Sequence, residues 1–404
     1  IVDKTRYDKY ILKLLKDKRC EFKIFEKEKD MGIYTYFLPH VREYIFPTFE
    51  FRDEKLKDFK KAKTSLKSKI IANQTCACFT YNLDKNIKGK VDKDANSIFF
   101  NIEKIEIICF NTGICFFTMK TNLEGTNDFY DVLDFNYKFR DINSEFSSLK
   151  SYDKIRIQTD TFKDIKDISE LINQITGIYK RKMSGETEDL TNSRFYTYSY
   201  VCLEQEYWNE KNSIEDYPTD FFKFANVFPS NYFSDFNKDN LNKNLTIIDK
   251  YKYYKIALTK LSSNLICSGV DTYNFTKLPF EYENEYFYTF IIALYQKMFL
   301  RKLNSEFKEY SKIVKMREEF IRFTKQLWDN EITLGDNGTK YYKTLKNVFE
   351  IDELYEEIKN KYEIIYKNLN IEKNNMYFMV LIILLVCSFA LNLLNIFMIV
   401  KLMI

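Results

Sequence analysis

The run "NNMYFMVLIILLVCSFALNLLNIFMIVKLMI" (residues 374–404) decides how this chain is interpreted, because it is almost free of charge and follows a body rich in Lys and Glu. From Met376 to Val400 the run has no charged residue. An α-helix of about twenty residues is enough to cross a hydrocarbon core about 30 Å thick. The sequence therefore predicts a C-terminal transmembrane helix over residues 376–404. Because the chain stops at Ile404 without a polar tail, we also expect a second spanning helix to follow in the complete protein.

Three polar residues inside this run share one helix face. Ser388, Asn392 and Asn395 are separated by four and three positions, the spacing that places side chains on one side of an α-helix. An amide in a membrane needs a hydrogen-bonding partner or water. This face is therefore predicted either to contact neighbouring helices or to line a pore.

The preceding helix carries two apolar rows with a seven-residue spacing. One row holds Ile351, Ile358 and Ile365, and the other holds Tyr355, Tyr362 and Leu369. Such rows form a seam of the coiled-coil type. Three interpretations remain open: packing against an earlier helix of the same chain, self-association, or both.

The rest of the chain alternates between strand and helix patterns. "KIEIICFNTGICFFTMKT" (104–121) predicts a hairpin that turns at Asn111-Thr112-Gly113, and "GIYTYFL" (32–38) alternates as a strand does. Residues 285–328 contain no Gly or Pro and predict one long helix. We expect an α+β fold, in which a mixed α/β cytoplasmic domain precedes a long helical hairpin and stalk and the transmembrane helix. The predicted boundaries are 1–280 for the sensing domain, 281–340 for a long helix and turn, 341–375 for the stalk and 376–404 for the spanning helix.

Composition argues against several functional classes. The net charge is only +4 and no basic stripe is present, so we expect no polymeric nucleic acid partner. The chain has a single His and none of the common phosphate-binding or metalloprotease motifs, so we expect no enzyme and no covalent cofactor. The eight Cys form no CxxC pair and are expected to be reduced structural thiols. The sequence identifies no particular metal-binding residues.

Three arginines lie beside aromatic residues and are candidates for binding a ligand. They are Arg42 in "HVREYIF", Arg140 in "FNYKFRD" and Arg194 in "SRFYTYSY". A guanidinium next to an aromatic ring can bind a phosphate while the ring stacks on a base. The alternative is that each Arg is bonded to a local carboxylate or backbone carbonyl.

The predicted order of a mixed α/β domain, a helical hairpin, a stalk and a polar-striped spanning helix is similar to that of the CorA family of divalent-cation channels. The Gly-Met-Asn signature of that family is absent, and the corresponding region reads "ALNLLNIFMIV" (390–400). The chain therefore resembles a divergent subgroup, the CorA-like membrane effectors that accompany type III CRISPR systems.

This resemblance implies a homo-oligomeric ion channel in the inner membrane, with the pentamer as its expected assembly. Basic residues before the spanning segment favour a cytoplasmic N-terminal domain. The ligand implied by the resemblance is a nucleotide second messenger of the S-adenosylmethionine–AMP type, acting in antiviral defence. The alternatives are a membrane-anchored interaction or sensor protein without a pore, and a divalent-cation (Mg²⁺-type) transporter.

Overall fold

The fold is known from a computed structural model, which divides the chain into two compact units, Ile1–Ile351 and Asp352–Ile404. The described residues are 2, 6–51, 53–83, 87–93, 96–125, 128–140, 155–159, 166–177, 195–233, 245–307, 313–328 and 331–403. The first unit is a mixed α/β domain, which confirms that part of the predicted fold class. The second unit consists of most of one helix, α15 (Ile351–Met403).

A seven-stranded sheet forms the first half of the α/β unit. Its strands run in the order β1-β2-β4-β3-β6-β7, and β5 also pairs with β4. The strands are β1 (Cys20–Phe22), β2 (Cys76–Tyr81), β3 (Ile87–Lys93), β4 (Asn96–Phe110), β5 (Cys115–Glu124), β6 (Arg156–Thr159) and β7 (Lys166–Asp167). The β4–β5 hairpin confirms the sequence prediction, and Gly113 in its turn has a φ of 87°, a conformation that favours glycine.

Strand β4 organises this sheet because three strands pair with it. β5 pairs along nearly its whole length, whereas β3 and β2 pair with successive parts of its other edge. β3 pairs with residues 96–101 of β4, and β2 pairs with residues 105–110 of the same strand. Two short strands therefore lie end to end along a single long one.

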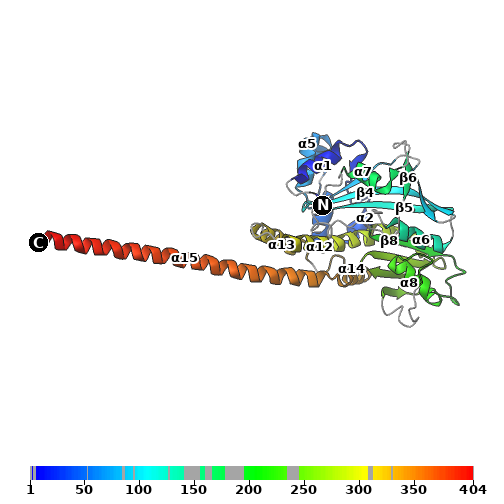
Figure 1. The fold of residues 1–404 in the computed structure, drawn as a ribbon. Helices are drawn as coiled ribbons and strands as arrows, with labels where there is room; N and C mark the ends of the chain where they lie inside the picture. Colours follow the sequence, from blue (N-terminus) through cyan, green and yellow to red (C-terminus); the bar gives the residue numbers. More distant parts are fainter. Residues whose placement is uncertain are drawn as a thin grey trace. The chain divides into compact units, whose positions relative to one another are not determined.

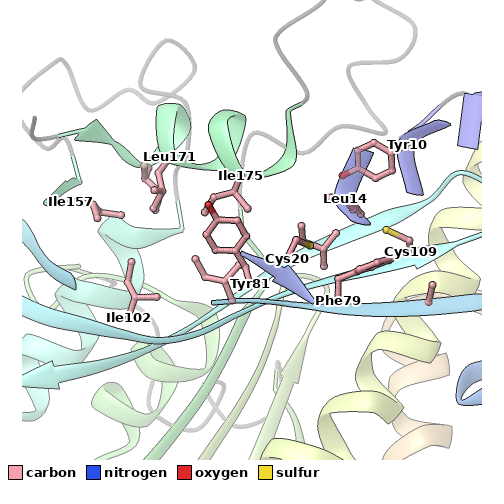
Figure 2. Close-up of a cluster of buried hydrophobic side chains, with 14 of the residues drawn as sticks. Tyr10, Leu14, Cys20, Phe79, Tyr81, Ile102, Cys109, Ile157, Leu171 and Ile175 are labelled. Carbon is pink, nitrogen blue, oxygen red and sulfur yellow. The ribbon is translucent and has the colours of Figure 1, made fainter. Parts of the chain in front are cut away.

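Three helices cover one face of this sheet (Figures 1 and 2). They are α1 (Tyr7–Lys16), α5 (Thr64–Ala72) and α7 (Ile168–Thr176). Their buried residues recur every three or four positions, as Ile11 and Leu14 do in α1 and Leu171 and Ile175 do in α7. These side chains pack with apolar residues of the strands into one core cluster.

A four-stranded sheet forms the second half of the unit. Its order is β8-β11-β10-β9, with β8 parallel to β11 and the other pairs antiparallel. The strands are β8 (Thr197–Leu203), β9 (Thr246–Tyr251), β10 (Tyr254–Thr259) and β11 (Ser262–Ser268). Helices α6 (Phe129–Phe139) and α8 (Pro218–Asn226) and the 3₁₀ turn η3 (Ile214–Asp216) join this sheet in a second core cluster.

Helix α12 (Phe287–Glu306) contacts both sheets. Every residue from Tyr288 to Leu300 is buried, so all sides of the helix are covered over this length. Tyr295 stacks on Phe110 of β4 at 3.7 Å between ring centroids, and Phe290 lies 5.4 Å from the Tyr198 ring of β8. The helix therefore forms a shared core for the two sheets.

The remaining elements are short or follow α12. They are α2 (Met31–Tyr36), α3 (Pro39–Ile45), η2 (Pro47–Glu50), α4 (Asp53–Lys61), α10 (Tyr273–Thr276), α11 (Leu278–Glu281), the π-helical turn η5 (Tyr282–Tyr286), α13 (Ile313–Leu327) and α14 (Asp336–Val348). Two predictions are wrong here. Residues 32–38 form most of α2 rather than a strand, and residues 285–328 contain α12 and α13 rather than one helix.

The predicted C-terminal transmembrane helix is also corrected. Among the residues that the structure describes, no helix is both long and apolar enough to cross a membrane. In the later part of α15, residues 368–403, side chains are described from Met376 to Ser388 and again at Leu391.

Gly89 offers a direct test of the packing in the first sheet. It pairs with Phe100 across β3 and β4, and a Cβ atom placed on it would lie 2.1 Å from the Phe100 ring. Because that ring is buried and cannot move away freely, we expect Gly89→Ala to lower the free energy of unfolding by about 1–3 kcal/mol. Urea denaturation measures this change.

Gly335→Ala is the matched control for Gly89→Ala. Its added Cβ would find its nearest neighbour, Thr333 Oγ1, at an ordinary 3.9 Å. We expect a change below about 0.5 kcal/mol for this variant. Equal effects at the two glycines would contradict the close approach of the Phe100 ring to Gly89.

Candidate functional site

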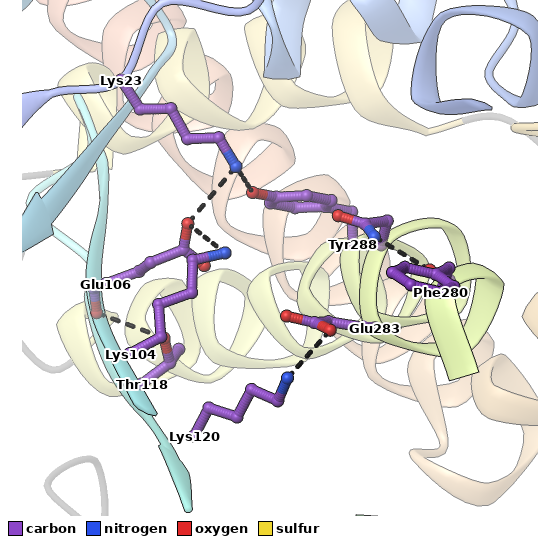
Figure 3. Close-up of polar contacts among 9 residues, drawn as sticks. Lys23, Lys104, Glu106, Thr118, Lys120, Phe280, Glu283 and Tyr288 are labelled. Atoms are coloured by element: carbon purple, nitrogen blue, oxygen red, sulfur yellow. Dashed lines mark hydrogen bonds and ion pairs between the residues drawn. The ribbon is translucent and has the colours of Figure 1, made fainter. Parts of the chain in front are cut away.

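A cluster of charged side chains lies between the first sheet and α12 (Figure 3). Glu106 of β4 is 5% exposed, and its Oε1 lies 3.3 Å from Lys23 Nζ and 3.1 Å from Lys104 Nζ. Lys23 also donates a hydrogen bond of 3.1 Å to the Tyr288 hydroxyl of α12. Two ammonium groups thus share one buried carboxylate, and these three ionic side chains together carry a net positive charge.

The strand pattern explains why Lys104 and Glu106 occur together. They are two positions apart on β4 and therefore point to the same face of the sheet, between apolar residues. Lys23 follows β1. The charge balance of the cluster opposes the binding of a cation, because a second ammonium group already lies beside the only carboxylate among these side chains.

A second ion pair joins the sheet to the π-helical turn before α12. Lys120 of β5 lies 2.8 Å from the Glu103 carboxylate and 3.0 Å from Glu283 of η5. Partial burial lowers the pKa of Lys120, but the two carboxylates outweigh it and the net shift is upward. This lysine therefore stays charged and links β4, β5 and η5.

The π-helical turn itself is supported from the second sheet. A π-turn disrupts the regular helical hydrogen-bond ladder, and such turns are frequent at functional sites. The Tyr198 hydroxyl of β8 donates a 2.6 Å hydrogen bond to the Tyr282 carbonyl, and the two rings stack at 4.3 Å. Burial, followed by the charge of Glu281, raises the pKa of Glu285 in this turn to about 7.

Two of the three arginines predicted to bind a ligand are bonded to the backbone at helix ends. Arg42 donates to the carbonyls of Tyr34 and Phe37, at 2.5 and 2.8 Å, and lies over the Tyr34 ring. It thereby satisfies carbonyl groups at the C-terminal end of α2. Arg140 donates to the carbonyl of Val227, the C-cap of α8, at 3.1 Å. Arg194 lies outside the described residues, and ligand binding at all three stays a prediction.

Helix α15 presents an uninterrupted apolar surface in the second unit. Eleven consecutive residues are between 47% and 73% exposed: Met376, Tyr377, Phe378, Met379, Val380, Leu381, Ile382, Ile383, Leu384, Leu385 and Val386. Leu391 is 62% exposed as well. Because successive helical residues are about 100° apart, these side chains point to every side of the helix. We call residues 376–386 the apolar segment.

Of the other residues predicted to be functional on this later part of α15, only some have described side chains. Ser388 is exposed, whereas the side chains of Asn392, Asn395 and Leu369 lie outside those described. Pore lining by this face stays a prediction.

The predicted seam is covered unevenly. Ile351 and Ile358 have no exposed surface and Tyr362 is 8% exposed, whereas Tyr355 and Ile365 are half-buried. Whether this seam packs within the chain or against a second copy stays a prediction.

No protein family, curated protein or solved structure matches this chain. The resemblance to CorA-like effectors therefore stays a prediction. Within the described part of the chain, no group of three or more His, Cys, Asp or Glu side chains is arranged to hold a metal ion. The features that remain for functional argument are the charged cluster beside α12 and the apolar segment of α15.

From the charged cluster we expect that neutralising Glu106 lowers the stability of the fold. Glu106→Gln keeps the shape of the side chain but leaves two neighbouring ammonium groups without their shared carboxylate. We expect the free energy of unfolding to fall by about 1–3 kcal/mol. The control Glu103→Gln removes a 38% exposed carboxylate and should cost less than about 1 kcal/mol. Similar losses for both variants, measured by urea denaturation, would show that Glu106 has no special role.

The raised pKa of Glu285 predicts a stability that depends on pH. The folded-state value of about 7 exceeds the ordinary 4.5, so the native state keeps a proton that the unfolded chain releases. The free energy of unfolding should therefore fall as the pH rises from about 4.5 through 7.

Glu285→Gln should remove this contribution. Wild type should lose about 2 kcal/mol more than the variant between about pH 5 and pH 8. Urea denaturation across this pH range measures the difference. Glu283→Gln, in the same turn, is the control and should keep the wild-type slope. An unchanged slope in Glu285→Gln would rule out this carboxyl as the source.

Proposed function

We propose that this chain is a membrane-attached interaction or sensor protein, in which the apolar segment of α15 binds a lipid bilayer. One observation carries the proposal: eleven consecutive apolar side chains are exposed on all sides of the helix. A partner protein with a single groove covers one face of a helix and leaves the others in water. Hydrocarbon can surround the helix from every direction, so lipid suits this surface better.

The size of the apolar segment supports stable binding to a lipid bilayer. Burying the remaining half of a Leu or Ile side chain contributes about 1 kcal/mol, so eleven such residues contribute on the order of 10 kcal/mol. Attaching a protein to a surface costs part of this through lost translational and rotational freedom. Patches of this extent on soluble proteins mark interaction sites.

The apolar segment differs from the earlier part of the same helix. There, Lys359 pairs with Glu356 and Lys361 with Glu357, at the three- and four-residue spacings that stabilise a helix in water. The polar part of α15 thus suits an aqueous environment and the apolar segment suits a lipid one. Membrane attachment of this kind does not require a pore.

Gated ion conduction by a homo-oligomer stays a prediction from the family resemblance. It relied on a helix that crosses the membrane, and no helix among the described residues is both long and apolar enough for that. The attachment proposed here keeps the lipid partner and the interaction or sensor role without that requirement. The α/β unit would be the part of the protein that a ligand or partner contacts.

Vesicle flotation tests the proposal. The full chain should float with vesicles of phosphatidylcholine and phosphatidylglycerol. The double variant Ile382→Asp/Leu385→Asp should remain unbound, because a carboxylate in hydrocarbon costs about 3 kcal/mol and two reduce binding by about four orders of magnitude.

A matched variant in the polar part of the helix provides the control. Glu356→Gln/Lys359→Gln removes an ion pair of α15 outside the apolar segment and should float as wild type does. If wild type fails to bind vesicles and instead forms a defined oligomer in detergent-free buffer, the apolar segment is covered by other copies of the chain and the proposal is wrong.

A further inference from the structure

Two cysteines face each other on neighbouring strands of the second sheet. Cys202 of β8 pairs directly with Cys267 of β11 in the parallel register. Neighbouring strands lie about 4.8 Å apart, which is within the Cα separation of about 4.4–6.8 Å that a disulfide spans. Paired residues of adjacent strands point to the same face of a sheet, so both thiols lie on one side.

The two thiols have different access to solvent. All eight cysteines lie in the described ranges, and the exposed ones are Cys202 and Cys387. Cys267 is completely buried. A soluble oxidant can therefore reach the sulfur of Cys202 first, while Cys267 is held directly beside it.

The hydrogen bonds of Cys267 favour a reactive Cys202. The Cys267 thiol lies 3.2 Å from the Tyr200 hydroxyl, which itself donates to the Asn274 carbonyl. The Cys267 thiol also lies 3.5 Å from the Val201 carbonyl, and its interaction with Cys202 lowers the pKa of Cys202. The same interaction, followed by burial, raises the pKa of Cys267. Thiolate character thus concentrates on the exposed sulfur.

We propose that Cys202 and Cys267 form an oxidisable dithiol that hydrogen peroxide converts into a disulfide, a modification site separate from the apolar segment. The Cys202 thiolate attacks one peroxide oxygen and the O–O bond breaks, which gives a sulfenic acid and hydroxide. The Cys267 sulfur then attacks the Cys202 sulfur and the S–O bond breaks. The thiol proton of Cys267 combines with the departing hydroxide as water. Two thiols are oxidised and one peroxide is reduced to two waters.

The disulfide would act on the structure through β8. Among the described strands, β8 is an end strand of its sheet and pairs only with β11. It also carries Tyr198, which donates to the Tyr282 carbonyl of the π-helical turn. A covalent link at residue 202 would therefore fasten the strand that supports this turn.

Peroxide treatment of the purified full chain tests the proposal. After quenching with catalase, free thiols are counted in denaturant and peptides are mapped by mass spectrometry without reduction. We expect the loss of two of the eight thiols per chain and a peptide pair joined through Cys202 and Cys267. A reductant such as dithiothreitol should restore both thiols.

Three serine variants separate this outcome from general oxidation. Cys267→Ser should stop the reaction at a sulfenic acid on Cys202, which dimedone traps. Cys202→Ser should abolish the joined peptides, whereas Cys387→Ser, which removes the other exposed thiol, should leave them unchanged. Matching circular dichroism spectra would establish that the variants fold.

Two results would overturn the proposal. One is oxidation of Cys202 no faster than that of Cys387 in the wild-type chain, with no joined peptide. The other is a folded Cys267→Ser variant that loses the same number of thiols as wild type through a different pairing.

Discussion

The central constraint in the α/β unit is a helix with no solvent-facing side over thirteen residues, Tyr288–Leu300 of α12. Such a helix needs a partner in every direction, and here two sheets and two further helices provide them. Its polar side chains must be satisfied internally. Gln296 donates to the Leu327 carbonyl of α13 at 2.7 Å and exchanges hydrogen bonds with the Tyr342 hydroxyl of α14. The positions of α13 and α14 therefore follow from the burial of α12.

Local sequence predicts those elements whose causes are local. The β4–β5 hairpin follows from alternating apolar residues and from Gly113 at its turn. "GIYTYFL" alternates as a strand does, which is why the sequence predicts a strand. Arg42 and the burial of Ile33 instead stabilise a helix there, through contacts that the alternating pattern does not contain. The end of α14 is similarly hidden. Glu350 adopts a φ of 56° without being Gly, so no residue type marks the break before α15.

Some functional features can likewise be predicted from local sequence, whereas others depend on contacts made only in the fold. The exposed apolar segment of α15 is visible in the sequence, although no helix among the described residues is both long and apolar enough to span a membrane. The spacing of Lys104 and Glu106 on one strand face is a local signal for a buried charge pair. Lys23, Tyr288 and Glu285 join or surround this region through the fold alone. No periodicity in the sequence could have brought together Cys202 and Cys267, which are separated by more than sixty residues.

The position of α12 late in the chain has a consequence for synthesis. On the ribosome, β4 and β5 emerge about 160 residues before α12, which at roughly 5–20 residues per second corresponds to about ten to thirty seconds. During that interval the face of the first sheet that will hold Phe110 against Tyr295 has no helix to cover it. A nascent chain in this state exposes an aromatic surface to other nascent chains, so chaperone capture during translation becomes part of how this fold is reached.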